Sequence, residues 1–169
     1  MRSSITALVL ICWTAASLPC FMELWGGEGD DGGRSLLVLD DGYLMAGHAE
    51  AGPAGDLQAW ILQVDGAGDS VDSRLYGDPD LDEYCLDICS LQDGSYALTG
   101  SAADASGGYH LWAAGLDSNL NAIWRTVIED PGDDAGYSVV EHPDGGILVA
   151  GSRSVSGSTG YGRLLRFDA

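Results

Sequence analysis

Short apolar runs separated by turn residues make up most of this chain. The runs are four to eight residues long, are partly β-branched or aromatic, and are bounded by Gly, Asp, Asn and Ser. Runs of this length predict strands rather than helices. Asp-Gly pairs stand between runs and favour tight hairpins, because both residues tolerate the backbone angles of the turn. The pattern predicts an all-β protein built from antiparallel hairpins, with Asp-Gly turns at Asp41-Gly42, Asp93-Gly94 and Asp144-Gly145.

The whole pattern occurs three times. The glycines of the Asp-Gly pairs are 52 and then 51 residues apart. An acidic pair precedes each glycine, and an apolar run ending in aspartate follows it. Four short strands at this period are typical of one β-propeller blade, so we predict three four-stranded antiparallel blades. The acidic pairs that keep this register are Asp30-Asp31, Asp82-Glu83 and Asp133-Asp134.

The aligned runs also predict where the strands lie. In the first two copies they cover residues 35–39, 43–48, 58–64, 70–76, 87–91, 95–101, 109–116 and 122–128. The third copy supplies 138–142, 147–152 and 162–167 but no fourth strand, and residues 22–25 stand where a fourth strand would precede the first copy. We therefore divide a repeat domain of residues 21–169 into blade 1 at about 33–76, blade 2 at about 85–128, and blade 3 at about 136–169 completed by 22–25.

The repeat resembles a known family. The stretch from Trp25 to Asp31, followed by Asp-Gly, a spaced glycine and a Trp-x-x-x-x-Asp run, is similar to the secreted kelch-like β-propeller repeats of bacteria and archaea. The resemblance covers residues 22–169 and implies the fold. It implies almost nothing about activity, because a shared fold does not transfer function.

Three blades do not make a ring, because propellers typically have 4 to 8. Two explanations remain open from the sequence. Either two chains form a six-bladed ring and exchange terminal strands, or the chain is the front part of a longer propeller. In the second case the protein is a partial propeller that other blades complete.

Residues 1–20 differ in composition from the rest of the chain. Arg2 is followed by the uncharged apolar stretch 5–13 and by small residues at Ala15-Ala16-Ser17. This pattern predicts a cleaved signal peptide rather than a membrane span or a buried helix, since a span needs about 20 apolar residues. Export places the protein outside the cytoplasm, as secreted, periplasmic or cell-surface material. Cys20 adds a lipid anchor as an alternative to simple export, although Ser17 and Pro19 depart from the lipoprotein motif.

Charge and composition limit the classes of partner that the protein can bind. Seven Arg against 26 Asp and Glu give a formal net charge of −19, and the chain contains no Lys. A surface of this sign repels phosphate, which excludes nucleic acid as a partner. Apolar residues make up 46% of the chain, which is enough to bury a core and argues against disorder.

One acidic loop has a candidate chemistry. Asp78, Asp80 and Asp82 alternate within a single turn, as carboxylates do in calcium loops, because a hard cation takes several oxygens from one short segment. The loop is not an EF-hand, since Glu83 stands at its sixth position and Cys89 at its twelfth. The alternative is that these aspartates shape turns and keep an exported protein soluble.

Four other residues are expected to be structural. Cys85 and Cys89 are predicted to share one strand face about 13 Å apart, too far for a disulfide, which needs Cα atoms within about 7 Å. Trp60 and Trp112 occupy one repeat position and are predicted to lie in the core. Recognition is expected in the loops around residues 102–108 and 152–160.

We expect a binding or scaffold module for an extracellular protein or glycan, with no cofactor except the calcium candidate and no catalytic residues. The alternatives are a hydrolase or lyase with an acidic site at the propeller channel, or a fragment of a longer propeller protein.

Overall fold

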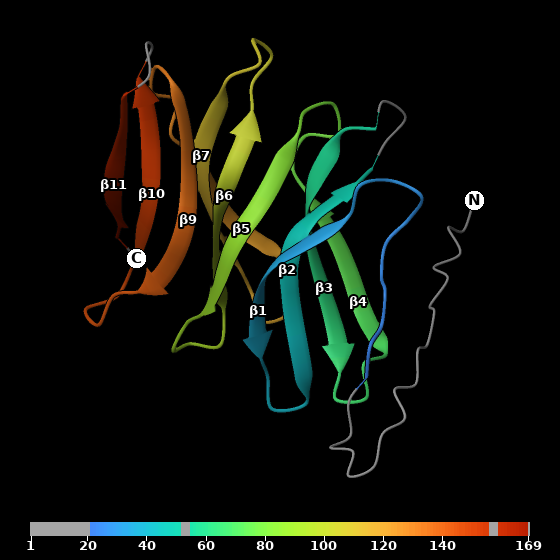
Figure 1. The fold of residues 1–169 in the computed structure, drawn as a ribbon. Helices are drawn as coiled ribbons and strands as arrows, with labels where there is room; N and C mark the ends of the chain where they lie inside the picture. The colour runs from blue at the N-terminus through green and yellow to red at the C-terminus, as the bar shows by residue number, and fades with distance from the viewer. Residues whose placement is uncertain (1–20, 52–54, 156–158, 169) are drawn as a thin grey trace, which may run out of the picture.

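The computed structural model describes residues 21–51, 55–155 and 159–168. This part of the chain forms eleven strands in three antiparallel sheets (Figure 1). It contains no helix long and apolar enough to cross a membrane. The predicted signal peptide, with Cys20 at its end, lies outside the described residues.

Each sheet is one copy of the repeat. The first contains β1 (Gly32–Val38), β2 (Gly42–Glu50), β3 (Leu57–Asp65) and β4 (Ser70–Tyr76) in that order. The second contains β5 (Glu83–Ser90), β6 (Tyr96–Ala103), β7 (Tyr109–Leu116) and β8 (Ala122–Val127). The third contains β9 (Asp133–Glu141), β10 (Ile147–Val155) and β11 (Thr159–Phe167). The sheets stand side by side, and their first strands β1, β5 and β9 are neighbours in space.

The all-β prediction is confirmed, and the three sheets among the described residues form an open row rather than a closed ring. The predicted fourth strand of the third sheet is not formed within this chain, because residues 22–25 adopt no strand. Trp25 instead packs on the outer face of the first sheet, against the buried cluster that contains Trp60, Leu62 and Val64. Burying its ring there removes apolar surface from water, which an isolated edge strand would not do.

The first strand of every sheet carries a β-bulge. The extra residues are Arg34, Leu86 and Tyr137, which are spaced like the repeat itself. The bulges extend β1, β5 and β9 several residues upstream of the predicted starts. A glycine on the second strand lies opposite each bulge, where a Cβ atom would collide with a backbone carbonyl oxygen; these are Gly47, Gly100 and Gly151. Close approach of two strands therefore explains the last glycine of each repeat motif.

The bulge in β5 also corrects the expected placement of the cysteines. Both thiols are free, as predicted, but they do not share a face. Cys85 is buried between the first and second sheets, whereas Cys89 packs between the second and third. The residue inserted by the bulge shifts the two-residue alternation, so positions four apart point to opposite faces.

The core lies between the sheets. Leu44 and Ile61 of the first sheet meet Leu98 and Trp112 of the second. A second cluster joins the second sheet to the third. The burial predicted for the two tryptophans is confirmed, with Trp112 between two sheets and Trp60 on the outer face of the first sheet beside Trp25.

Candidate functional site

In the second and third copies of the repeat, the first acid of the acidic pair joins two sheets. Asp82, just before β5, accepts a hydrogen bond from the Leu57 N–H of the first sheet at 2.9 Å. Asp133, at the start of β9, accepts one from the Tyr109 N–H of the second sheet at 3.0 Å. In both cases the carboxylate reaches the first residue of the preceding sheet's third strand. Asp82 and Asp133 therefore hold neighbouring sheets in register.

In the same two copies, the second acid of the pair is buried beside an arginine. Glu83 accepts a hydrogen bond from Arg125 at 2.8 Å, and Asp134 accepts one from Arg163 at 2.9 Å. Burial raises the pKa of both carboxyls, while the neighbouring guanidinium groups act in the opposite direction. Charge pairing thus compensates part of the cost of taking each carboxylate out of water.

Raised pKa values in the folded state give a pH prediction. The folded protein holds protons on Glu83 and Asp134 at pH values where the unfolded chain has lost them, so this contribution to stability is largest below the ordinary pKa and is lost as the pH rises above it. We expect the melting temperature to fall from about pH 4.5 upward, and to fall less in Glu83→Gln/Asp134→Asn. Asp40→Asn/Asp41→Asn removes the same charge from exposed positions and is the control. Equal slopes in both double variants would contradict the prediction.

The three aspartates of the calcium prediction lie in one turn but serve different hydrogen bonds. Asp78 accepts from the Asp80 N–H at 3.0 Å, whereas Asp82 is directed to the first sheet. No group of three or more His, Cys, Asp or Glu side chains suited to a metal ion occurs among the described residues. Calcium binding at this loop stays a prediction.

Its test is a thermal melt. Calcium binding to the folded loop would raise the melting temperature, and a chelator would lower it. Asp78→Asn/Asp80→Asn should abolish that rise without harming the fold, because both side chains are exposed and bond to no other sheet. Magnesium serves as the control ion, and an unchanged melting temperature at millimolar calcium would end the calcium interpretation.

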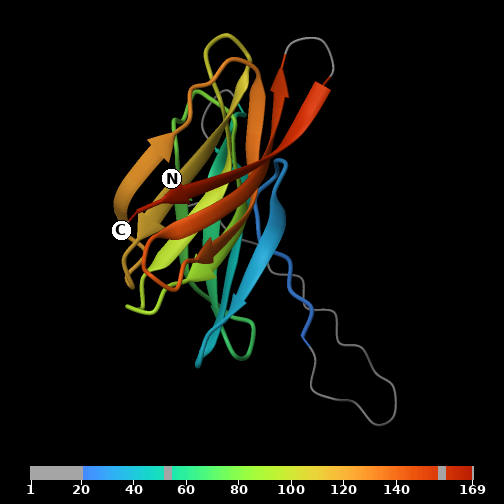
Figure 2. The same cartoon turned by 90° about the vertical axis from the view of Figure 1, so that its left-hand side faces the viewer.

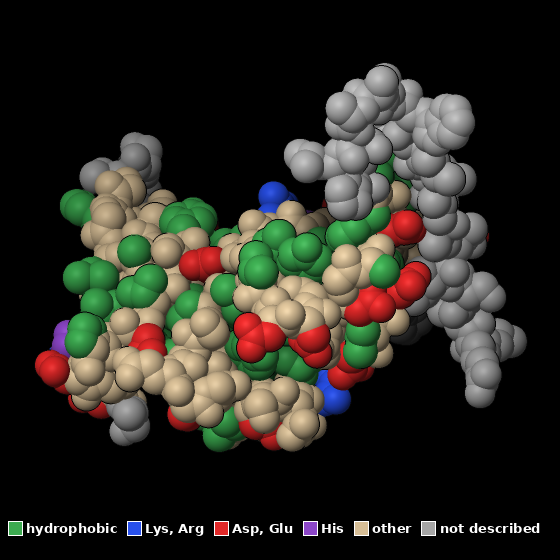
Figure 3. All heavy atoms as spheres, turned by 90° about the horizontal axis from the view of Figure 1, so that it is seen from below, with side chains coloured by type: hydrophobic (Ala, Val, Ile, Leu, Met, Phe, Trp, Pro, Cys, Tyr) green, Lys and Arg blue, Asp and Glu red, His purple; other side chains and the backbone are tan. Residues whose placement is uncertain are grey.

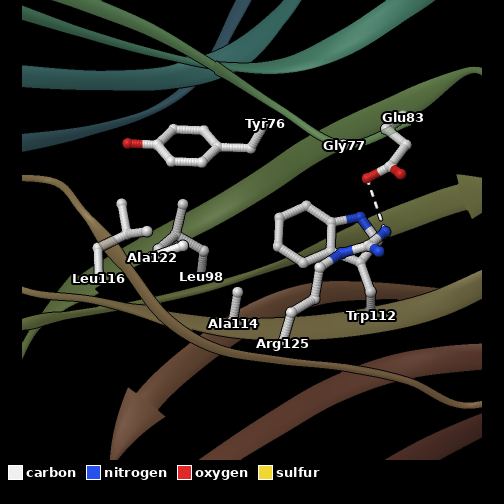
Figure 4. Close-up of a pocket in the computed structure, with 9 residues that line it drawn as sticks. All are labelled: Tyr76, Gly77, Glu83, Leu98, Trp112, Ala114, Leu116, Ala122 and Arg125. Carbon is white, nitrogen blue, oxygen red and sulfur yellow. Dashed lines mark hydrogen bonds and ion pairs between the residues drawn. The ribbon is translucent and has the colours of Figure 1, made fainter. Parts of the chain in front are cut away.

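A small cavity of about 140 Å³ lies between the first and second sheets (Figure 4). Tyr76, Leu98 and Leu116 form part of its apolar lining. The Arg125 guanidinium lies over the Trp112 ring, 5.8 Å from its centroid, and the Glu83 carboxylate pairs with it. The Arg125 charge is thus paired and stacked, which leaves the cavity suited to an apolar group no larger than a side chain.

Three rings gather at the rim that carries the loops between the second and third strands. His48 at the end of β2 meets Tyr84 of β5 edge to face at 5.1 Å between centroids, and Tyr84 meets Tyr109 of β7 at 6.3 Å. The Tyr109 hydroxyl lies 3.5 Å from the Asp82 carboxylate. We call His48, Tyr84, Tyr109 and Asp82 the rim cluster. Two sheets contribute to it, so it exists only when they are packed.

Burial sets the charge state of the rim cluster. It lowers the pKa of His48, an effect to which Arg34 adds, so the imidazole is neutral at pH 7. It raises the pKa of Tyr84, with further contributions from Tyr109 and Asp82. The His48 Nδ1 atom is buried and has no hydrogen-bond partner among the described residues. The cluster thus presents a neutral imidazole and two tyrosine rings beside one carboxylate.

The neighbouring loop is held in shape by Asp104. Its carboxylate accepts hydrogen bonds from Ser106 and lies 2.9 Å from His110 Nε2. These hydrogen bonds lower the pKa of Asp104, and the bond from the Ser106 side chain has the largest effect. The loop expected to carry recognition is therefore preorganised next to the rim cluster.

Sequence reasoning located the loops but missed His48 and Tyr84. These two side chains do not occupy equivalent repeat positions, so no periodic signal could single them out. Comparison of the chain with protein-family models and with curated proteins finds no match in either. Its function has to be argued from its own geometry.

Proposed function

We propose that this is an exported, kelch-like β-propeller repeat protein that acts as a binding or scaffold module for an extracellular glycan or protein. Three features support this proposal. They are the repeat period, the composition of residues 1–20, and the arrangement of the described strands in three antiparallel sheets of three or four strands. Ligand contact occurs at the rim formed by the loops that follow the second and fourth strands.

The rim cluster is the observation that carries the proposal, and it favours a glycan. Tyr84 and Tyr109 are partly buried but keep some exposed surface, so parts of both residues are available to a ligand. Aromatic faces pack on the apolar faces of sugar rings, and carboxylates accept hydrogen bonds from sugar hydroxyls. A net charge of −19 disfavours acidic polysaccharides. Neutral or amino-sugar oligosaccharides therefore fit best.

Titration with neutral glucan and chitosan oligosaccharides, followed by tyrosine and tryptophan fluorescence and calorimetry, tests the proposal. We expect saturable binding by at least one of them, weakened at least tenfold in Tyr84→Ala/Tyr109→Ala. Tyr161→Ala is the matched control, because Tyr161 is exposed on β11 and outside the rim cluster. Absence of binding to every oligosaccharide, or equal binding by the control and the double variant, would refute the glycan interpretation.

A further inference from the structure

One repeat position on the third strand is buried in two copies and exposed in the last. Ile61 and Ala113 are both 0% exposed, because the next sheet covers each of them. Leu164 stands 51 residues after Ala113 and is 71% exposed. It belongs to the third-sheet open face, on which Val140, Leu148 and Ala150 also lie. Figure 2 looks onto this sheet, and hydrophobic side chains are visible over it at the left of Figure 3.

One repeat position on the first strand is exposed in the first copy and buried in the other two. Ile88 and Val139 are each 2% exposed, because the preceding sheet covers them. Leu36 occupies the same position in the first sheet and is 60% exposed. It belongs to the face of the first sheet that no other sheet covers, which we call the first-sheet open face; this face and the N-terminal Phe21 and Trp25 line an apolar cavity of about 220 Å³. The other members of this face are Tyr43, Met45, Leu62 and Val64, and Trp25 of the same chain packs over part of it.

The two open faces are therefore the two halves of a contact that the molecule already makes twice. The third-sheet open face corresponds to the surface that the first sheet turns toward the second. The first-sheet open face corresponds to the surface that the second sheet turns toward the first. Surfaces related in this way are complementary to each other and not to themselves.

The groups that would form hydrogen bonds across this contact are also present on the chain. Asp30 aligns with Asp82 and Asp133, which bond the third strand of the preceding sheet. Asp30 has no preceding sheet among the described residues. The backbone N–H that it would reach by the same register belongs to Gly160 at the start of β11, in the position of Leu57 and Tyr109.

The segment before β1 has the shape of a connection between two sheets. Gly77 follows β4 with φ +119° and packs on Glu83, which accepts the Asp78 N–H. In the same way Gly26 has φ +144° and packs on Asp31, which accepts the Gly27 N–H. The first of these turns leads from the fourth strand of one sheet to the first strand of the next. Its counterpart therefore puts residues 22–25 at the position of a fourth strand of another sheet, although they form no strand in the single chain.

We propose that a second copy of this chain docks head to tail on both open faces and that the pair closes a ring of six sheets. Residues 22–25 of each copy then leave their own first sheet and pair with the outer edge of β11 in the other, an edge that no strand of the described residues occupies. Two copies give six sheets, within the usual range of 4 to 8, whereas one gives three and three give nine. Head-to-tail contacts that close in this way form a ring with no exposed apolar end.

Sedimentation velocity and light scattering on the purified chain test the proposal. We expect a particle of twice the chain mass of 17.6 kDa. Leu36→Asp and Leu164→Asp should each weaken dimerisation about 100-fold, since an aspartate enters both contacts of the ring. Both side chains are exposed in the single chain, so its fold, checked by circular dichroism, should survive. Ile123→Asp is the control: Ile123 and its repeat partner Val71 are 62% and 60% exposed even though their sheets pack against a neighbouring sheet.

Mixing the two variants separates head-to-tail docking from face-to-face pairing. One of the two contacts in a mixed dimer carries both aspartates, and the other carries none. An equimolar mixture should therefore recover dimer that neither variant forms alone. A folded monomer of the unchanged chain, a dimer indifferent to both substitutions, or no recovery on mixing would overturn the proposal. None of these readouts involves the rim cluster.

Discussion

Replacing Asp87 by alanine is expected to lower the free energy of unfolding by about 3 kcal/mol, because one carboxylate joins all three sheets. Its two oxygens accept hydrogen bonds from Ser35 Oγ of β1 at 2.6 Å and from the Val139 N–H of β9 at 2.8 Å. Hydrogen bonds to a charged group contribute about 1.5–3 kcal/mol each, and truncation leaves the buried Val139 N–H without a partner. Urea unfolding measures the change.

Two further variants show whether the connection between sheets is responsible. Ser35→Ala removes only one of the two bonds and should cost about 1 kcal/mol. Asp72→Ala removes a partly exposed carboxylate that pairs with Arg74 on its own strand, and should cost less than about 0.5 kcal/mol. If Asp87→Ala were no worse than Asp72→Ala, the three-sheet role of Asp87 would be wrong.

Gly100→Ala is expected to be at least as damaging, with a loss of about 3 kcal/mol or more. A Cβ atom at this position would collide with the Tyr84 carbonyl oxygen at the β5 bulge. The clash is with backbone, which cannot rotate away, so the strand pairing itself has to open. Thermal or urea unfolding of the variant gives the magnitude.

Gly94→Ala separates this clash from glycine's conformational freedom. Gly94 has φ +84° and nothing within 4 Å of the position its Cβ would take. Its replacement should cost only about 1 kcal/mol of backbone strain. Equal losses for Gly94→Ala and Gly100→Ala would mean that the bulge is not the reason for the repeated glycine.

The hairpins and the repeat were predictable because their signals are local. Asp-Gly turns and runs of four to eight apolar residues specify strands without reference to distant parts of the chain. Gly47, Gly100 and Gly151 were visible as aligned positions, but the sequence contains no mark of the bulge that requires them. The prediction that Cys85 and Cys89 share a face is wrong because of the same bulge, since a simple two-residue period assumes unbroken pairing along the strand.

Contacts between sheets were beyond sequence reasoning. The sequence predicts a calcium ligand or a turn residue at Asp82, whereas its hydrogen bond to Leu57 joins positions 25 residues apart. Residues 22–25 have the composition of a strand, but only packing decides which surface they cover in the chain. His48 and Tyr84 meet because β2 and β5 lie side by side, and nothing in their spacing indicates this.

The sequence by itself determined that the chain is all-β, that it repeats three times and that each repeat folds as antiparallel hairpins. Periodicity and turn chemistry depend on residues that are close in sequence, so both can be recognised before the tertiary structure is known. The tertiary structure decided which carboxylates connect sheets, where the rim cluster lies and which two faces are left open. These depend on side chains from different repeats, which come within bonding distance only after the sheets pack and exclude water between them.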